Sequence, residues 1–294
     1  MKLRGIFPPI ATPFDHNGDL YIAKIHHNIG RWNRTNLAGY VVCGSTGESV
    51  MLTEAEKIRL FEEAAKAADP AKLLIAGTGV ESVRETVSLT NRAAEFGYRA
   101  AMVRTPHYYK NLCPKPETQK LYYRAVADQS KIPLIIYNWP QTTGVDIPPE
   151  TVAELAGHPN IIAIKESSGN VEKLMELIRI VPEGFQVLTG SAPTLYPSLL
   201  LGAVGAILAF SNAAPFLCLS IEEAVRMREY KAARELQDLA SPAAVAVTTK
   251  YGVPGLKYAM DLQGYYGGNP RLPLIPPSPG ARKHIEEVFR EIKS

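Results

Sequence analysis

Short apolar runs alternate with amphipathic stretches along most of the chain. Eight of these runs are about as long as a buried strand. They cover residues 5–10, 39–43, 73–77, 100–103, 134–137, 161–164, 185–188 and 204–210. The runs are nearly continuous in apolar residues rather than alternating with polar ones. That pattern is typical of strands covered on both faces, as in a parallel sheet.

Helical patterns fill the gaps between the apolar runs. Thr53 and Glu56 have the spacing of a capping box for a helix that ends at Asp69-Pro70. Residues 83–96 carry apolar side chains at helical spacing and stop at Gly97. Eight strands alternating with helices over about 220 residues match the count of a (β/α)₈ barrel. A doubly wound sheet would use the same alternation, so the count leaves these two folds open.

The pattern changes beyond about residue 220. Ser220 and Glu223 have the spacing of a second capping box, and a long stretch rich in Ala, Arg and Glu follows without a further strand signal. We therefore predict two parts, residues 1–219 as the strand–helix unit and residues 220–294 as a helical domain packed on it.

Composition excludes several classes of protein. The 294 residues are 46% hydrophobic and 21% charged, with a net charge of +3, which is the balance of a globular protein. No basic stripe indicates a nucleic-acid partner, and no apolar run approaches the roughly 20 residues of a membrane span. The N-terminal segment lacks the apolar run of a signal peptide, so we expect a cytoplasmic protein.

Neither cysteine nor histidine spacing indicates a metal site. The three cysteines lie far apart, at positions 43, 113 and 218, and form no CxxC pair. His107 has no second histidine or carboxylate at ligand spacing. We therefore expect no metal and no other cofactor.

The segment at residues 44–49, Gly-Ser-Thr-Gly-Glu-Ser, directly follows the second apolar run. Its glycines allow a tight turn that exposes backbone N–H groups, and the hydroxyls of Ser45 and Thr46 add further donors. Such a loop could hold a carboxylate or a phosphate, although an ordinary Gly/Ser turn has the same composition. It lacks the spacing and lysine of a P-loop. We interpret Glu48 as a stabiliser of a first helical turn.

Two further polar groups close predicted strands. Tyr137 ends the fifth run, where it could relay protons or could simply be an amphipathic core residue. Lys165 follows four apolar residues of the sixth run, so its side chain either enters the barrel mouth or marks the exit of the strand into water. If it is buried, desolvation lowers its pKa and makes it an amine nucleophile for a Schiff base.

Taken together, these segments resemble the pyruvate-dependent class I aldolases that include dihydrodipicolinate synthase and N-acetylneuraminate lyase. The resemblance covers nearly the whole chain, from about residue 5 to residue 273. It implies a (β/α)₈ TIM barrel with a C-terminal helical domain, and a homotetramer built as a dimer of dimers. It also implies a lyase that needs no cofactor and acts on pyruvate, a 2-oxo acid, and an aldehyde.

The resemblance implies a role for each matching residue. Lys165 matches the Schiff-base lysine, and Tyr137 matches the tyrosine that relays protons to and from the substrate. Tyr108 matches a tyrosine that reaches a neighbouring subunit's site, although Tyr109 beside it leaves the register open by one residue. The remaining expected roles are Thr46 in the proton relay, Ser45, Thr46 and Gly47 on the pyruvate carboxylate, and Gly190 and Ile207 along the pocket.

One departure from the family pattern concerns the second substrate. Dihydrodipicolinate synthases usually carry an arginine for the aldehyde's carboxylate where this chain has Thr142. Scaffold segments look most like 4-hydroxy-2-oxoglutarate aldolases. The prediction is therefore cleavage of a 4-hydroxy-2-oxo acid to pyruvate and an aldehyde. The alternatives are dihydrodipicolinate synthase, a sugar-acid lyase or dehydratase, and a barrel that binds a keto acid without turnover.

Overall fold

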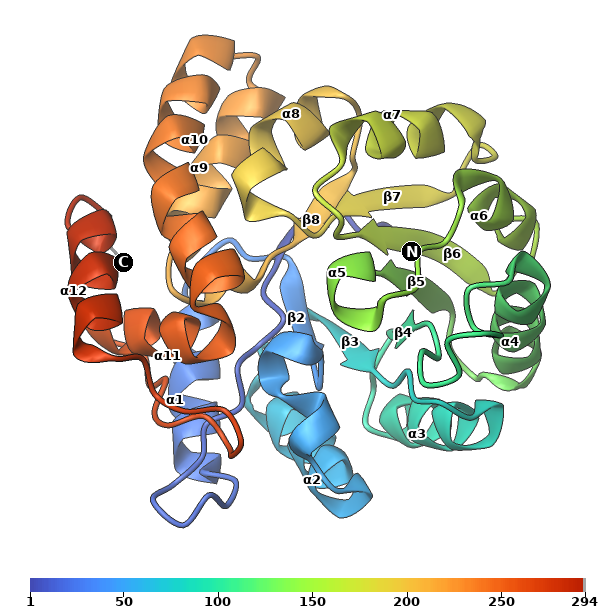
Figure 1. The fold of residues 1–294 in the computed structure, drawn as a ribbon, viewed down its shortest axis with the longest axis horizontal. Helices are drawn as coiled ribbons and strands as arrows, with labels where there is room; N and C mark the ends of the chain where they lie inside the picture. Colours follow the sequence, from blue (N-terminus) through green and yellow to red (C-terminus); the bar gives the residue numbers. More distant parts are fainter. Residues whose placement is uncertain (293–294) are drawn as a thin grey trace.

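Eight parallel strands form a barrel surrounded by helices in the computed structural model, which describes residues 1–292 (Figure 1). Each of the eight apolar runs overlaps one strand, which confirms the predicted count. The strands are β1 (Gly5–Phe7), β2 (Gly39–Val42), β3 (Leu73–Gly77), β4 (Ala100–Arg104), β5 (Leu134–Asn138), β6 (Ile161–Glu166), β7 (Gln186–Thr189) and β8 (Gly205–Ile207).

The ends of the sheet meet, and this distinguishes a barrel from a doubly wound sheet. Strand β1 pairs with β8 in parallel register, so the first and last strands are neighbours. Between β1 and β2, Val41 donates its N–H to the Pro8 carbonyl at 3.0 Å and accepts from the Ile10 N–H at 2.9 Å. These bonds bring β1 alongside β2, and the (β/α)₈ barrel expected from the family resemblance is confirmed.

The helices of the barrel follow the strands in turn. Helix α2 begins as predicted, because Glu56 N–H donates to the Thr53 hydroxyl while the Thr53 N–H donates to the Glu56 carboxylate. The helices up to β8 are α1 (Ile22–Trp32), α2 (Glu54–Ala67), α3 (Val83–Glu95), α4 (Pro116–Gln129), α5 (Pro140–Thr143), α6 (Pro149–Leu155), α7 (Val171–Ile180) and α8 (Leu195–Leu200).

Alternation along each strand decides which side chains face the barrel interior. In β5, Ile135 and Tyr137 belong to the interior cluster, whereas Leu134 and Ile136 pack against the outer helices. The same alternation places Ala163 of β6 inside and Ile164 outside. Continuing it by one residue points the side chain at position 165 into the barrel mouth.

The predicted start of the C-terminal helix is wrong. Helix α9 (Pro215–Arg226) begins five residues before Ser220, so Ser220 lies inside it and caps nothing. Pro215 occupies the first turn, where its missing N–H costs no helical hydrogen bond. Cys218 and Ile221 continue a buried stripe that packs the whole helix on the barrel. The proposed boundary between residues 219 and 220 therefore falls within a helix.

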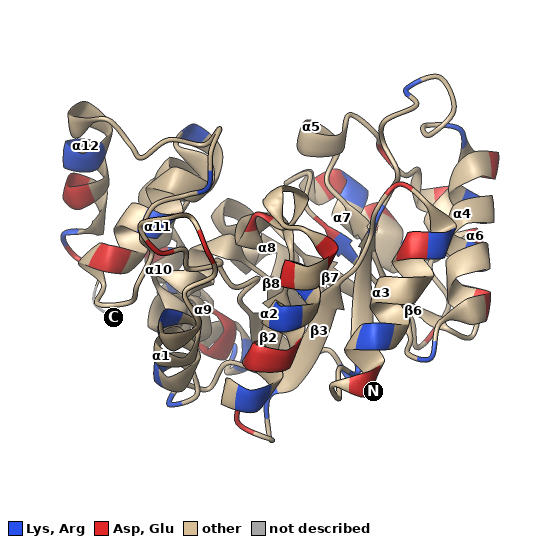
Figure 2. Cartoon of the chain, turned by 90° about the horizontal axis from the view of Figure 1, so that it is seen from below, with Lys and Arg blue, Asp and Glu red and all other residues tan. Residues whose placement is uncertain are grey.

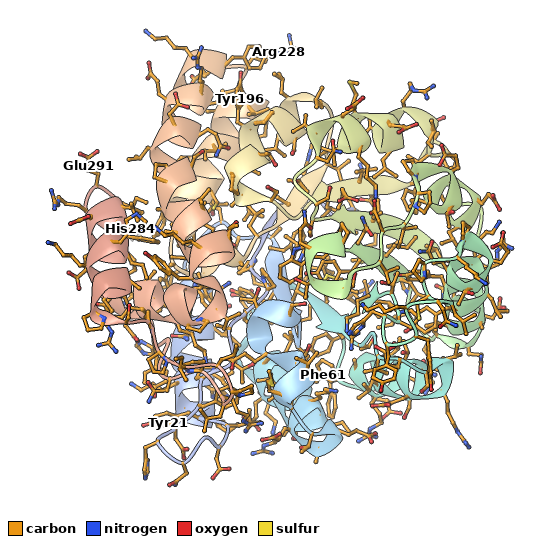
Figure 3. The ribbon with its side chains drawn as sticks, viewed as in Figure 1. Tyr21, Phe61, Tyr196, Arg228, His284 and Glu291 are labelled. Atoms are coloured by element: carbon orange, nitrogen blue, oxygen red, sulfur yellow. The ribbon has the colours of Figure 1, made fainter. Side chains whose placement is uncertain are left out.

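The region after α9 contains several helices rather than one long one. Arg228, labelled in Figure 3, adopts φ 62° and separates α9 from α10 (Tyr230–Val245). Helix α10 continues into a π-helical turn, Ala246–Lys250, and α11 (Gly252–Leu262) and α12 (Pro279–Phe289) follow. Tyr196 of α8 donates its backbone N–H to Gln237 of α10 at 2.8 Å, which ties these helices to the barrel.

Charged side chains of both signs are interspersed over the outer helices (Figure 2). Within residues 1–292, no helix combines the length and the apolar composition needed to cross a membrane.

Candidate active site

A cavity of about 700 Å³ opens at the carboxyl ends of the barrel strands. Its size is within the range of small-molecule sites, and its place is where barrel enzymes carry their chemistry. The strands and their loops contribute Ser45, Tyr137 and Lys165, and the π-helical turn contributes Thr248 and Thr249. The C-terminal helices thus form one wall of the cavity.

Lys165 enters this cavity from the end of β6. Only 5% of the residue is exposed, so the interpretation of Lys165 as the exit of a strand into water is wrong. Its amine lies 4.0 Å from the centroid of the Tyr137 ring, on the neighbouring strand and in register with it. Burial lowers the pKa of the amine to about 7. A large fraction of Lys165 is therefore the free amine at neutral pH.

The carboxylate beside Lys165 in the chain does not neutralise it. Glu166 points to the other side of β6 and accepts hydrogen bonds from the Asn138 side chain at 2.8 Å and the Ser168 N–H at 2.7 Å. Lys173 lies 3.7 Å from the same carboxylate. Within residues 1–292 no salt bridge reaches Lys165, so its charged form lacks compensation and its pKa stays low.

Tyr137 is buried beside Lys165, and burial raises the pKa of its phenol well above the usual value. Three groups act in the opposite direction, namely the Ser45 side chain, the charge of Arg104 and the Ser167 side chain. The phenol is therefore protonated at neutral pH and has polar neighbours that favour a developing phenolate. Such a group can donate and recover a proton next to an imine.

Gly190 leaves the room that the lysine needs. A Cβ atom at this position would lie 2.8 Å from Lys165 Cε and 1.8 Å from Ser167 Oγ, which a larger residue could not accommodate. Ser167 Oγ is buried and lines the cavity, where the side chain also lowers the pKa of the Tyr137 phenol. This hydroxyl therefore lies beside both the amine and the phenol.

The loop expected to hold a carboxylate forms a short 3₁₀ helix, Ser45–Gly47. Ser45 and Thr46 both line the cavity. Gly47 lies below it, where a Cβ would come within 2.9 Å of the Ile10 carbonyl oxygen. The hydroxyls of Ser45 and Thr46 thus face the cavity while a close backbone contact fixes the loop from behind.

The interpretation of Glu48 as a first-turn helix stabiliser is wrong. Glu48 adopts φ 56° between two short 3₁₀ helices, and 2% of it is exposed. Lys257 of α11 places its amine 2.6 Å from Glu48 Oε1, and Arg271 donates its backbone N–H to Oε2 at 2.8 Å. Glu48 directly follows the loop of Ser45 and Thr46 and adopts a left-handed backbone conformation. Its ion pair with Lys257 therefore connects helix α11 to the end of this loop.

Three of the expected site residues do not reach the cavity. Gly47 supports the loop from below, and Ile207 is a core side chain inside the barrel. Tyr108 is 74% exposed and stacks edge-on against Tyr109, at a ring-centroid distance of 5.3 Å. A role for either tyrosine in a neighbouring subunit's site stays a prediction.

Sequence reasoning missed several polar residues of the cavity, among them Arg104 and Ser167. Arg104 carries the signal that identified Lys165, because a basic residue closes the apolar run 100–103 just as Lys165 closes 161–164. Ser167 is two residues beyond Lys165 and therefore on the same face of an extended segment. His107 lies in the cavity wall, and its Nδ1 is 2.7 Å from Arg104 Nη1.

Comparison with known proteins identifies relatives over the full chain. The profile of the dihydrodipicolinate synthetase family matches residues 2–292. A 4-hydroxy-tetrahydrodipicolinate synthase from Exiguobacterium sp. is 35% identical over 98% of this chain and 99% of its own length. The enzyme of the same name from Neisseria gonorrhoeae is 33% identical over 98% of each chain.

Solved structures agree with this assignment. A dihydrodipicolinate synthase from Bacillus anthracis matches with a TM-score of 0.95 and 29% identity, covering 100% of both chains. The dihydrodipicolinate synthase of Aquifex aeolicus matches with a TM-score of 0.93 and 31% identity over 98% of each chain. These relatives carry the synthase name that the sequence analysis placed second, and none of them supports the preference for a 4-hydroxy-2-oxoglutarate aldolase.

Proposed function

Because the chain belongs to the dihydrodipicolinate synthetase family of class I pyruvate aldolases, we propose that Lys165 forms an imine with pyruvate. The pyruvate bound in this way is then joined to an aldehyde, or is released from one by cleavage of a carbon–carbon bond. The observation that carries the proposal is the buried lysine at the barrel mouth, whose amine has a pKa of about 7 and no carboxylate partner among the described residues. Such an amine is nucleophilic at neutral pH.

The proposed chemistry begins with attack of the Lys165 amine on the ketone carbon of pyruvate. Tyr137 gives a proton to the departing hydroxyl, so that water leaves and an iminium remains. The phenolate then takes a proton from the methyl group, which gives an enamine. The enamine carbon bonds to the aldehyde carbon, and the aldehyde oxygen takes a proton from Tyr137. Water then adds to the iminium, the proton it releases returns to the Tyr137 phenolate, and hydrolysis frees Lys165. Bond cleavage is the same path in reverse.

The loop at Ser45 and Thr46 supplies the orientation that this path needs. Its hydroxyls face the cavity, and we place the pyruvate carboxylate on them. Holding the ketone near the amine turns a bimolecular attack into an effectively unimolecular one. Ser45 also acts on the phenol of Tyr137, so in this arrangement the hydroxyl that holds the substrate borders the proton donor.

Condensation of pyruvate with aspartate semialdehyde is the first candidate reaction, on the strength of the relatives named 4-hydroxy-tetrahydrodipicolinate synthase. Cleavage of a 4-hydroxy-2-oxo acid such as 4-hydroxy-2-oxoglutarate is the second. One observation favours the second: Thr142 occupies the place where the synthases usually carry an arginine.

Two assays on the purified protein separate these reactions. The first supplies pyruvate with aspartate semialdehyde and measures loss of both, and the second supplies 4-hydroxy-2-oxoglutarate and measures pyruvate release. Borohydride added with pyruvate should leave a pyruvate-derived mass increment on the peptide that contains Lys165. A folded protein that gains no such increment contradicts the proposal, whichever aldehyde is used.

A further inference from the structure

Arg104 is the last residue of β4, and its place in the sheet ties it to the proposed chemistry. It is in register with Tyr137 of β5, which is in turn in register with Lys165 of β6. Ala100 and Met102 of β4 belong to the interior cluster, so alternation turns Arg104 to the same side. All three side chains line the cavity.

The guanidinium of Arg104 is held along one edge only. Its Nη1 lies 2.7 Å from His107 Nδ1 and 3.3 Å from Glu81 Oε1. The other oxygen of Glu81 accepts the backbone N–H groups of His107 at 2.9 Å and Tyr108 at 3.1 Å, which fixes the loop around the arginine. Nε and Nη2 make no hydrogen bond with residues 1–292, so donors remain for a ligand.

Arg104 also supplies a positive charge that remains in the cavity throughout the proposed reaction. Among the described lining residues there is no carboxylate, and the other basic groups are His107 and Lys165. Burial and the charge of Arg104 lower the pKa of His107, and Lys165 is consumed as the imine. An arginine stays protonated throughout, and its planar fork matches a carboxylate.

The spacing fits a substrate with acidic groups at both ends. Neighbouring strands lie about 4.8 Å apart, so the backbones of Arg104 and Lys165, two strands apart, are separated by about 10 Å. Both side chains line the same cavity, on either side of Tyr137. A five-carbon 2-oxo acid bound as an imine at its second carbon can reach toward Arg104 with its far end.

We propose that Arg104 binds the second carboxylate of the substrate, the group that the aldehyde contributes, and so replaces the arginine that this chain lacks at Thr142. The proposal rests on the imine chemistry of the proposed function. It makes Arg104 the residue that selects aldehydes bearing a carboxylate over neutral ones.

Imine trapping with two 2-oxo acids tests this assignment without requiring turnover. 2-Oxoglutarate has a distal carboxylate, and 2-oxopentanoate has the same carbon chain without it. We expect the wild-type protein to be half-modified under borohydride at a lower concentration of 2-oxoglutarate than of 2-oxopentanoate. Arg104→Met should raise the concentration needed for 2-oxoglutarate about 10- to 100-fold, the worth of a hydrogen bond to a charged group, and leave 2-oxopentanoate unchanged.

Two further variants control the interpretation. Arg104→Lys keeps a cation and should restore part of the preference, whereas Arg92→Met, on the outer helix α3, should change neither acid. An unaltered preference in Arg104→Met refutes the role of Arg104 and leaves the proposed function standing. An equal loss with both acids also refutes it, since the arginine would then act on the shared end of the substrate. Absence of any adduct in the wild-type protein refutes the proposed function itself.

Discussion

Lys165 and Lys257 are both almost completely buried, but they lie in different regions and in opposite electrostatic settings. Lys165, at the barrel mouth, has no salt-bridge partner among the described residues, and burial lowers the pKa of its amine to about 7. Lys257, at the junction of α11 with the barrel, lies 2.6 Å from Glu48 and 4.5 Å from the centroid of the Phe14 ring. Burial lowers the pKa of Lys257 too, but Glu48 counteracts it.

The difference shows how one residue type acquires two functions. A lysine buried without an opposite charge gives up its proton near neutral pH and becomes a nucleophile. A lysine buried against a carboxylate has its charged form stabilised by that carboxylate, and the pair fixes two segments relative to each other. Here that pair joins the C-terminal helices to the loop of Ser45 and Thr46, so the second lysine supports the site in which the first one reacts.

Removing the amine at the barrel mouth should have the largest effect on activity. Lys165→Met is expected to abolish both turnover and borohydride-trapped pyruvate, because no other amine lines the cavity within the described residues. Its free energy of unfolding should equal or exceed that of the wild type, because an uncompensated buried amine is lost. Mass spectrometry and urea unfolding measure the two effects. A trapped adduct elsewhere in the cavity would show that the nucleophile is assigned wrongly.

Tyr137→Phe tests the proton donor next to that amine. Loss of a general acid should slow turnover by about 10²- to 10⁴-fold, because the phenol is the protonated group beside Lys165. The imine with pyruvate should still form, since the amine and the carboxylate loop are intact. Stopped-flow turnover and borohydride trapping separate the two steps. Full activity in the variant would remove Tyr137 from the mechanism.

Removing the paired lysine should act mainly on stability. Lys257→Met leaves the Glu48 carboxylate buried without its partner, which should cost about 3–5 kcal/mol in the free energy of unfolding. The double variant Lys257→Met with Glu48→Gln should recover part of that loss, because no unpaired charge remains. Lys231→Met, at an exposed pair with Glu235, serves as the control and should change stability by less than about 1 kcal/mol.

Lys257→Met also tests whether the Lys257–Glu48 pair only supports the site or takes part in the reaction. Pyruvate should still be trapped on Lys165 in Lys257→Met, but half-modification should need more pyruvate, because the loop of Ser45 and Thr46 precedes Glu48 directly. Complete loss of trapping in a folded variant would contradict a purely supporting role for the pair.

The pH dependence of imine formation and of stability should show the smallest effect, and the one most specific to Lys165. The rate of imine formation should rise about tenfold per pH unit up to pH 7 and then level off, because only the free amine of Lys165 reacts. The lowered pKa of Lys165 also sets the direction in which the free energy of unfolding changes with pH. The unfolded chain binds more protons between pH 7 and 10.5, so the contribution of Lys165 to stability rises over that range.

Comparing wild-type protein with Lys165→Met isolates this contribution. The excess stability of the variant should be greatest at and below pH 7 and should shrink toward pH 10.5. A gap that is constant with pH, or a rate that levels off only near pH 10, would show that burial does not lower the pKa of Lys165.

Local patterns in the sequence determined much of this protein. Eight continuous apolar runs predicted the eight strands, because strands covered on both faces need apolar residues at successive positions. The Thr53 capping box marked a true helix start, since its hydrogen bonds join residues three apart in the chain. Lys165 stood out because a lysine is rarely buried unless it is paired.

Tertiary structure decided the rest, wherever partners lie far apart in sequence. Ser220 resembles a cap, but the buried stripe upstream extends the helix past it. Glu48 became a buried ion pair only because Lys257, more than 200 positions later, packs against it. Arg104 carried the same signal as Lys165, but its place beside Tyr137 depends on strand register. Charges and hydrogen bonds act over a few ångström in space, and only the closed barrel sets those distances.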